Sequence, residues 1–226
     1  NCTGDDTKKC GGPWANTIYS TGSSGGGGGG SGSGGDGKTY TASWSSVDQH
    51  NAAPEWFQDA KFGIYFHWGA YAVQAWTNEW YPNGMFQVGH SFYNHHLATY
   101  GDPLGNWGYD KFITGAYDKS GNWTQFAPKL TSQGGNWDPD AWAQLFVDAG
   151  AKFAGPAAEH SDGFSLWKSS VNEWNAYDKG PKLDLVGQLA TSIRAKGLKF
   201  FVSDHNVSNF HGFYEAVPHQ SDPSLQ

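Results

Sequence analysis

Polar side chains able to bind or convert a small ligand lie directly after short apolar runs in this sequence. Histidine donates and accepts hydrogen bonds, and a carboxylate can act as an acid, a base or a nucleophile. An indole ring offers a flat apolar face that matches the C–H face of a sugar ring. The three groups are His67-Trp68 after residues 61–66, Glu159-His160-Ser161-Asp162 after residues 151–158, and Asp204-His205 after residues 198–202.

The elements that must position these groups alternate between strand and helix. Each of the three apolar runs is short and bounded by polar residues or glycine, as buried strands are. Residues 138–150 favour a helix with Asp138 as N-cap, Pro139 in the first turn and Gly150 at the end. Residues 183–196 favour a second helix, because apolar residues recur in them every four positions.

A strand–helix–strand–helix–strand pattern predicts parallel, right-handed βαβ units. Both an eight-stranded barrel and an open doubly wound sheet have this pattern. No Gly-x-Gly-x-x-Gly motif follows a strand, which disfavours the nucleotide-binding sheet. Active sites of β/α barrels are built at the carboxyl ends of the strands, where the polar groups fall. We therefore expect an α/β fold, a (β/α)8 TIM-type barrel with only about its first three strands in this chain.

The composition limits the classes of partner. Hydrophobic residues make up 38% of the 226 residues, and the 12 Trp, 11 Tyr and 14 Phe could bind sugars or fill a large core. A formal net charge of −7 with scattered signs argues against nucleic acid or an anionic membrane as partner. No apolar run approaches the roughly 20 residues needed to span a bilayer.

Two segments before residue 38 differ from the rest of the chain. Residues 1–20 form a small polar segment, in which a disulfide between Cys2 and Cys10 would close a loop of about nine residues. Residues 21–37 are almost entirely Gly and Ser, which is typical of a flexible linker. Residues 38–226 are expected to form the beginning of the barrel.

Three N-glycosylation motifs point to the secretory route. They begin at Asn1, Asn122 and Asn206. Together with the close cysteine pair, they predict a secreted or extracellular protein, or one in the lumen of a lysosome or vacuole. Asn122 is expected in an exposed loop, and Asn206 just past the third strand.

Several stretches resemble the α-L-fucosidase family of retaining glycoside hydrolases. Residues 56–69, Trp-Phe-Gln-Asp-Ala-Lys-Phe-Gly-Ile-Tyr-Phe-His-Trp-Gly, resemble the family's opening strand, and Glu79-Trp80-Tyr81-Pro82 its next signature. The resemblance continues in residues 93–101, 109–113, 164–167, 184–189 and 197–200, and it covers about residues 54–215. It implies removal of α-linked L-fucose from a glycan or glycoprotein, by a retaining mechanism and without a cofactor.

The resemblance also implies roles for individual residues. His67 matches a histidine that binds the sugar's hydroxyl groups at the end of the first strand. Glu79 and Trp80 match a carboxylate and an indole that hydrogen-bond to the sugar and cover it. Trp68 is expected to line the same pocket.

His160 matches the first of two histidines that the family carries after the second strand. The second is replaced here by Ser161, so one hydroxyl contact is shortened or lost. We expect His67, Glu79, Trp80 and His160 to converge at the strand ends.

No catalytic residue is assigned within this chain. A retaining glycosidase needs two carboxyl groups about 5–5.5 Å apart. In the family the nucleophile is an Asp at the end of the fourth strand, and the acid/base follows later in the chain. Both are therefore expected beyond Gln226. We expect the barrel to be completed by further chain or by neighbouring copies in an assembly. Asp162 is expected to fix a loop, and Asp204 matches no catalytic position.

A second class of function stays open at this point. The chain could belong to an extracellular structural or carbohydrate-binding glycoprotein that uses the same scaffold without turnover, as Ser161 and the Gly-rich segment suggest. The adjacent His95 and His96 point about 100° apart on a helix and cannot both ligate one metal ion. We expect them to be structural, and the sequence alone suggests no metal site.

Overall fold

The computed structural model describes residue 41 and residues 43–49 and 53–205. The chain divides into two compact units, Asn1–Asp59 and Ala60–Gln226. Described elements of the first unit are α1 (Trp44–Val47) and α2 (Glu55–Ala60), which crosses the junction. The predicted Cys2–Cys10 disulfide, the Gly/Ser linker and the motifs at Asn1 and Asn206 lie outside the described residues.

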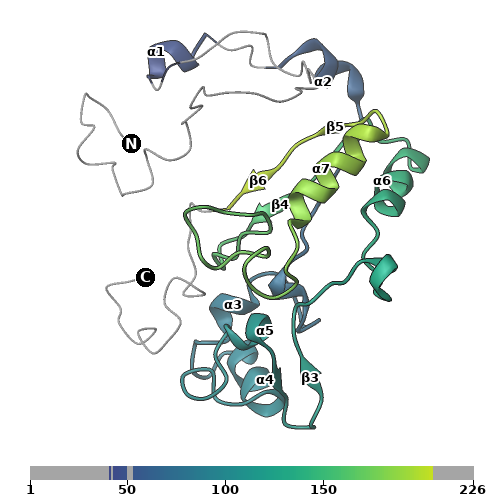
Figure 1. The fold of residues 1–226 in the computed structure, drawn as a ribbon. Helices are drawn as coiled ribbons and strands as arrows, with labels where there is room; N and C mark the ends of the chain where they lie inside the picture. Colours follow the sequence, from purple (N-terminus) through teal and green to yellow (C-terminus); the bar gives the residue numbers. More distant parts are fainter. Residues whose placement is uncertain (1–40, 42, 50–52, 206–226) are drawn as a thin grey trace. The chain divides into compact units, whose positions relative to one another are not determined.

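A parallel sheet organises the second unit (Figure 1). Its central strand is β4 (Phe153–Glu159), which pairs with β1 (Gly63–Phe66) on one side and with β5 (Lys199–Phe200) on the other. A further short strand, β6 (Ser203–Asp204), pairs with β4 beyond a register shift. The three predicted strands and their parallel direction are confirmed.

Both predicted helices are present. They are α6 (Pro139–Asp148) and α7 (Leu185–Ala195), which pack against each other, while α7 also packs on β4 and β5 (Figure 1). Asp138 caps α6 by accepting a hydrogen bond from the Ala141 N–H at 2.9 Å. Asp184 caps α7 through the Gly187 N–H at 2.8 Å. Each cap satisfies an N–H that has no partner within its own helix.

Between β1 and α6 the chain forms short elements that the sequence analysis described only in part. They are η1 (Ala70–Ala72), α3 (Tyr81–Gly84), α4 (Ser91–Thr99), α5 (Lys111–Thr114), β2 (Ala116–Tyr117), β3 (Trp123–Thr124) and η2 (Thr131–Gln133). The antiparallel hairpin of β2 and β3 corrects the expectation of only three strands before residue 205. Two-residue strands show no periodicity, so the hairpin depends on its turn, where the Asp118 carboxylate accepts the N–H groups of Ser120 and Asn122 at 2.8 Å each.

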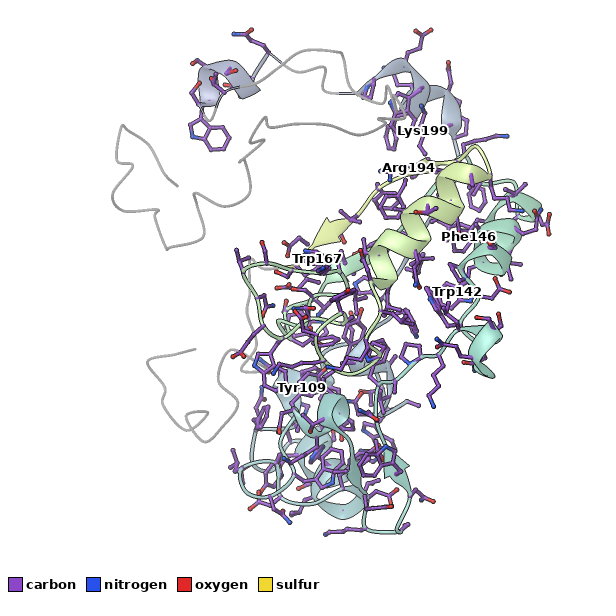
Figure 2. The ribbon with its side chains drawn as sticks, in the orientation of Figure 1. Tyr109, Trp142, Phe146, Trp167, Arg194 and Lys199 are labelled. Carbon is purple, nitrogen blue, oxygen red and sulfur yellow. The ribbon has the colours of Figure 1, made fainter. Side chains whose placement is uncertain are left out.

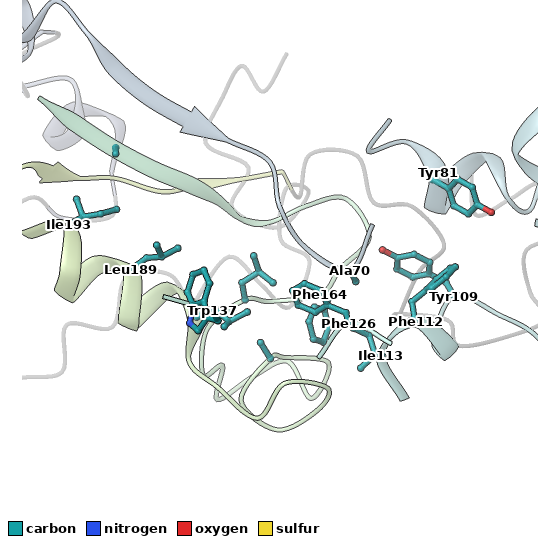
Figure 3. Close-up of a cluster of buried hydrophobic side chains, with 14 of the residues drawn as sticks. Ala70, Tyr81, Tyr109, Phe112, Ile113, Phe126, Trp137, Phe164, Leu189 and Ile193 are labelled. Atoms are coloured by element: carbon teal, nitrogen blue, oxygen red, sulfur yellow. The ribbon is translucent and has the colours of Figure 1, made fainter. Parts of the chain in front are cut away.

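The core of the second unit is unusually rich in aromatic rings (Figure 3). Trp137 is buried there and donates its indole N–H to Gln188 Oε1 on α7 at 2.7 Å. Trp142 and Phe146, labelled in Figure 2, extend the core along α6. Much of the aromatic content therefore fills the core, which was one of the two uses expected of it.

The close approach of β4 to its neighbour gives a stability prediction. A Cβ added at Gly155 would overlap the backbone carbonyl oxygen of Phe201, which cannot move without breaking the sheet. In the full-length protein, Gly155→Ala should lower the free energy of unfolding by about 3 kcal/mol, measured by urea denaturation. Gly121→Ala, at an open position with a φ of 81°, should lose only about 1 kcal/mol. Equal losses would contradict the close packing of β4.

Candidate functional site

Three imidazole rings meet at the carboxyl ends of the parallel strands. His67 follows β1, His160 follows β4, and His205 follows β6. Their ring centroids lie 5.3 Å apart for His67 and His160, 5.2 Å for His67 and His205, and 4.8 Å for His160 and His205. Because parallel strands end on the same edge of a sheet, residues almost 140 positions apart in sequence form one cluster.

Alternation along β1 sends neighbouring side chains to opposite faces. The Tyr65 ring lies beside the His67 and His205 rings, with centroids 5.0 and 6.4 Å away. Trp68 instead stacks on Trp137, at 4.9 Å and 15° between planes, within the aromatic core. Trp68 therefore packs against the core, and its expected contact with the sugar pocket stays a prediction.

His205 is held from several sides. Its N–H donates to the carbonyl of Glu159 at 3.1 Å, and its own carbonyl accepts the Ser161 hydroxyl at 2.9 Å. Its ring Nε2 lies 2.6 Å from the Tyr65 hydroxyl, which also contacts the Ser203 hydroxyl at 2.8 Å. The position of His205 after the third predicted strand did not by itself indicate a role for it.

Glu79 acts electrostatically on the same cluster. Its charge raises the pKa values of His67 and His160, against the larger opposing effect of burial. Trp80, the next residue, is half exposed, and its contact with a sugar stays a prediction. The geometry thus brings His67 and His160 together, with Glu79 close enough to influence both.

The segment that carries Glu79 is anchored by the start of α3. Tyr81 is fully buried, and its hydroxyl lies 3.1 Å from the Nδ1 atoms of both His95 and His96 on α4. His96 Nε2 also contacts the Trp107 carbonyl at 2.8 Å, and burial lowers the pKa of His96 to about 4. These contacts give both histidines the structural role that their adjacency indicated.

Burial favours the neutral form of two imidazoles of the cluster, His67 and His160. Burial, together with the nearby His205 and His67, lowers the pKa of His160 to about 4. Burial also lowers the pKa of His67, with His205 as the next cause. A neutral imidazole has one donor and one acceptor nitrogen, so each ring can bind a hydroxyl group in either sense.

Two buried polar side chains of the segment after β1 have no hydrogen-bond partner among the described residues. They are Tyr71, through its hydroxyl, and Gln74, through both polar atoms of its amide. The Tyr71 ring centroid lies 5.0 Å from that of His160, which places a buried hydroxyl near the imidazoles. Leaving such groups unsatisfied costs about 1–3 kcal/mol each, and a ligand rich in hydroxyls could satisfy them.

Asp162 lies behind the cluster and is almost fully buried. It accepts the Tyr109 hydroxyl at 2.7 Å and the Phe164 N–H at 3.2 Å. Burial raises its pKa to about 7. These bonds agree with the expected loop-fixing role, whereas Asp204 on β6 is exposed.

A parallel β/α sheet with polar side chains gathered at its strand ends defines a class of proteins that bind small ligands at that edge. A family model described as Alpha-L-fucosidase matches residues 32–225, and this chain belongs to that family. The match begins inside the Gly/Ser segment, earlier than the resemblance noted from the sequence.

Curated relatives and solved structures agree with this assignment. The chain is 34% identical to the tissue alpha-L-fucosidase of Mus musculus over 178 residues, or 78% of this chain and 35% of that protein. It is 32% identical to the plasma alpha-L-fucosidase of Homo sapiens over 156 residues, or 69% and 29%. A crystal structure of the Thermotoga maritima alpha-fucosidase superposes with a TM-score of 0.65 at 33% identity, covering 83% of this chain and 41% of that one. The chain therefore spans about a third of the length of the curated relatives.

The buried Asp162 predicts a pH dependence of stability. The pKa of Asp162 is 3.8 in the unfolded chain and about 7 in the folded one. At pH values between these two, the folded state holds the proton and the unfolded state does not. Its contribution to stability is therefore full below pH 4 and falls as the pH rises to 7, by up to ~1.4 kcal/mol per pH unit. Asp162→Asn should gain stability relative to the unmodified protein between pH 5 and 7.5, measured by urea denaturation. Parallel pH profiles for the two proteins would contradict the raised pKa.

Proposed function

We propose that this chain forms the sugar-binding part of an α-L-fucosidase, a glycoside hydrolase that removes α-linked L-fucose from glycans by a retaining mechanism. The observation that carries the proposal is the convergence of His67 and His160, from two different strands, with centroids 5.3 Å apart. Family membership supplies the substrate class. Among the described residues, no contact favours the non-catalytic alternative.

The cluster would bind the sugar through its hydroxyl groups. The rings of His67, His160 and His205 supply hydrogen-bonding nitrogens, and the Glu79 carboxylate adds a strong acceptor. Trp80, half exposed beside Glu79, is proposed to cover the apolar face of the ring. The nucleophile and the acid/base are proposed to come from parts of the protein outside residues 1–226.

The proposed architecture is an eight-stranded β/α barrel. The described strands β1, β4 and β5 run parallel, and α6 and α7 cover one face of the sheet. In such a barrel, further strands would pair with the free edges of β1 and β5, and the face that carries Tyr65 and His67 would point to the barrel axis.

The activity can be tested with a chromogenic fucoside. The full-length protein should hydrolyse 4-nitrophenyl α-L-fucoside, and His67→Ala and His160→Ala should each lower kcat/KM by about 10- to 100-fold. The loss follows from one or two hydrogen bonds removed, at about 1.4 kcal/mol per factor of ten.

A matched control separates the site from a general histidine effect. His90 caps α4 by accepting the Phe92 N–H at 3.3 Å, and asparagine is also a good N-cap. His90→Asn should therefore keep full activity. Absence of fucoside hydrolysis together with absence of L-fucose binding in calorimetry would refute the proposal.

The secretory route is a further part of the proposal. None of the described helices is long and apolar enough to cross a membrane. Asn122 is exposed in the loop between β2 and β3, a position that an oligosaccharide could occupy. We propose a secreted or extracellular glycoprotein, with a lysosomal or vacuolar lumen as the alternative.

Glycosylation at Asn122 can be tested without disturbing its turn. The Asn122 amide donates to the Asp118 carboxylate at 3.1 Å, so the substitution is better made at Thr124. In protein secreted by eukaryotic cells, Thr124→Ala should remove one glycan from the intact mass, whereas Thr124→Ser preserves the motif and should retain it. An unchanged mass in Thr124→Ala would show that Asn122 is unmodified.

A further inference from the structure

The three imidazoles at the strand ends have the arrangement of a metal site. His67, His160 and His205 each offer one ligand atom, and these atoms all lie within 4.8 Å of one another. We propose that these three histidines bind a divalent transition-metal ion of the Zn²⁺ type. Tetrahedral zinc with Zn–N bonds of about 2.0–2.1 Å places its nitrogen ligands roughly 3.4 Å apart, so the rings must close by about 1.4 Å at most.

Two of the three histidines are held in place, so the third must supply most of the closing movement. His160 is buried, and His205 is held through both its backbone N–H and its carbonyl. His67 is exposed at the end of β1, so its side-chain torsions can supply the remaining shift. One mobile ligand and two fixed ligands give a site that needs little reorganisation to bind the ion.

A hydrogen bond to the far nitrogen of a ligating histidine is a regular feature of metal sites. His205 has one, because its Nε2 lies 2.6 Å from the Tyr65 hydroxyl, which is itself 2.8 Å from the Ser203 hydroxyl. This contact leaves Nδ1 of His205 for the ion. Tyr65 is therefore a positioning residue for the metal site.

The donor set selects the kind of ion. Neutral imidazoles prefer Zn²⁺, Cu²⁺ and Ni²⁺, whereas Mg²⁺ and Ca²⁺ require oxygen ligands. The Glu79 charge, which acts on both His67 and His160, would offset part of the ion's charge. Three protein ligands leave a fourth position open to water.

The ion and the sugar would use the same nitrogen atoms. A bound ion would therefore block fucose, and the enzyme would be inhibited reversibly by transition metals. Binding of the ion does not depend on the proposed function, whereas its competition with fucose rests on it.

Calorimetric titration of the untagged, chelator-treated full-length protein with ZnCl₂ tests the site. The expected result is a site of one ion per chain with micromolar or tighter affinity, and no heat of binding with MgCl₂. His205→Ala and His160→Ala should each weaken that site at least tenfold, and Tyr65→Phe about tenfold. His90→Asn should bind as the unmodified protein does. Co²⁺ in place of Zn²⁺ should give the visible absorption of a tetrahedral ion, and His205→Ala should abolish it.

The outcomes separate the two proposals. Absence of zinc binding, or an affinity unchanged in both His205→Ala and His160→Ala, overturns the metal site whatever the fucosidase assay gives. If His205→Ala fails to fold, the Tyr65→Phe variant decides. An unchanged zinc affinity and an unchanged Co²⁺ spectrum in Tyr65→Phe would overturn the metal site. Zinc binding that these variants weaken but that saturating L-fucose leaves unaffected supports the metal site and counts against the proposed sugar site.

Discussion

Parallel pairing on both sides of β4 is the constraint on which the rest of the structure depends. Because β1 and β5 both run in the direction of β4, the connections from β1 to β4 and from β4 to β5 must each cross back over the sheet, and these connections contain α6 and α7. The same direction places the ends of the strands on one edge. The tight fit of Gly155 against the Phe201 carbonyl allows the third strand to approach β4 closely.

A buried polar network behind the strand ends keeps the chain after β4 in one conformation. Glu159 accepts a hydrogen bond from the Ser165 hydroxyl, which in turn accepts the Asn172 amide at 3.0 Å. Asn172 also donates to the Gly163 carbonyl at 2.9 Å. Hydrogen bonds that join buried groups such as Glu159 and Ser165 rigidify a loop, and His160 lies within it. The position of the imidazole is thus set by groups that do not face the ligand.

Local signals predicted the elements of the second unit well. Asp138 and Asp184 mark the helix starts through interactions within a single turn, and the apolar runs mark the strands. The hairpin around Asn122 was missed because strands of two residues have no readable period. Its formation depends on the Asp118 turn rather than on a hydrophobic pattern.

The candidate site was predictable only in part. His67 and His160 follow clear apolar runs, so their convergence follows from the parallel fold. The place of His205 depends on tertiary contacts with Tyr65 and Ser161, which leave no pattern in the sequence. Trp68 stacks in the aromatic core although it is next to His67 in sequence, because successive residues of an extended chain face opposite sides.

That alternation has a consequence for how the first strand can change over evolution. Tyr65 and His67 face the cluster, while Phe66 and Trp68 pack in the core, with Phe66 5.7 Å from the Trp142 ring centroid. Insertion or deletion of a single residue in β1 would exchange the two sets, burying an imidazole and exposing an indole. A change of two residues would preserve the faces and only shift them along the strand. Insertions and deletions in this strand are therefore restricted to even numbers of residues. Single substitutions on either face are not restricted in this way.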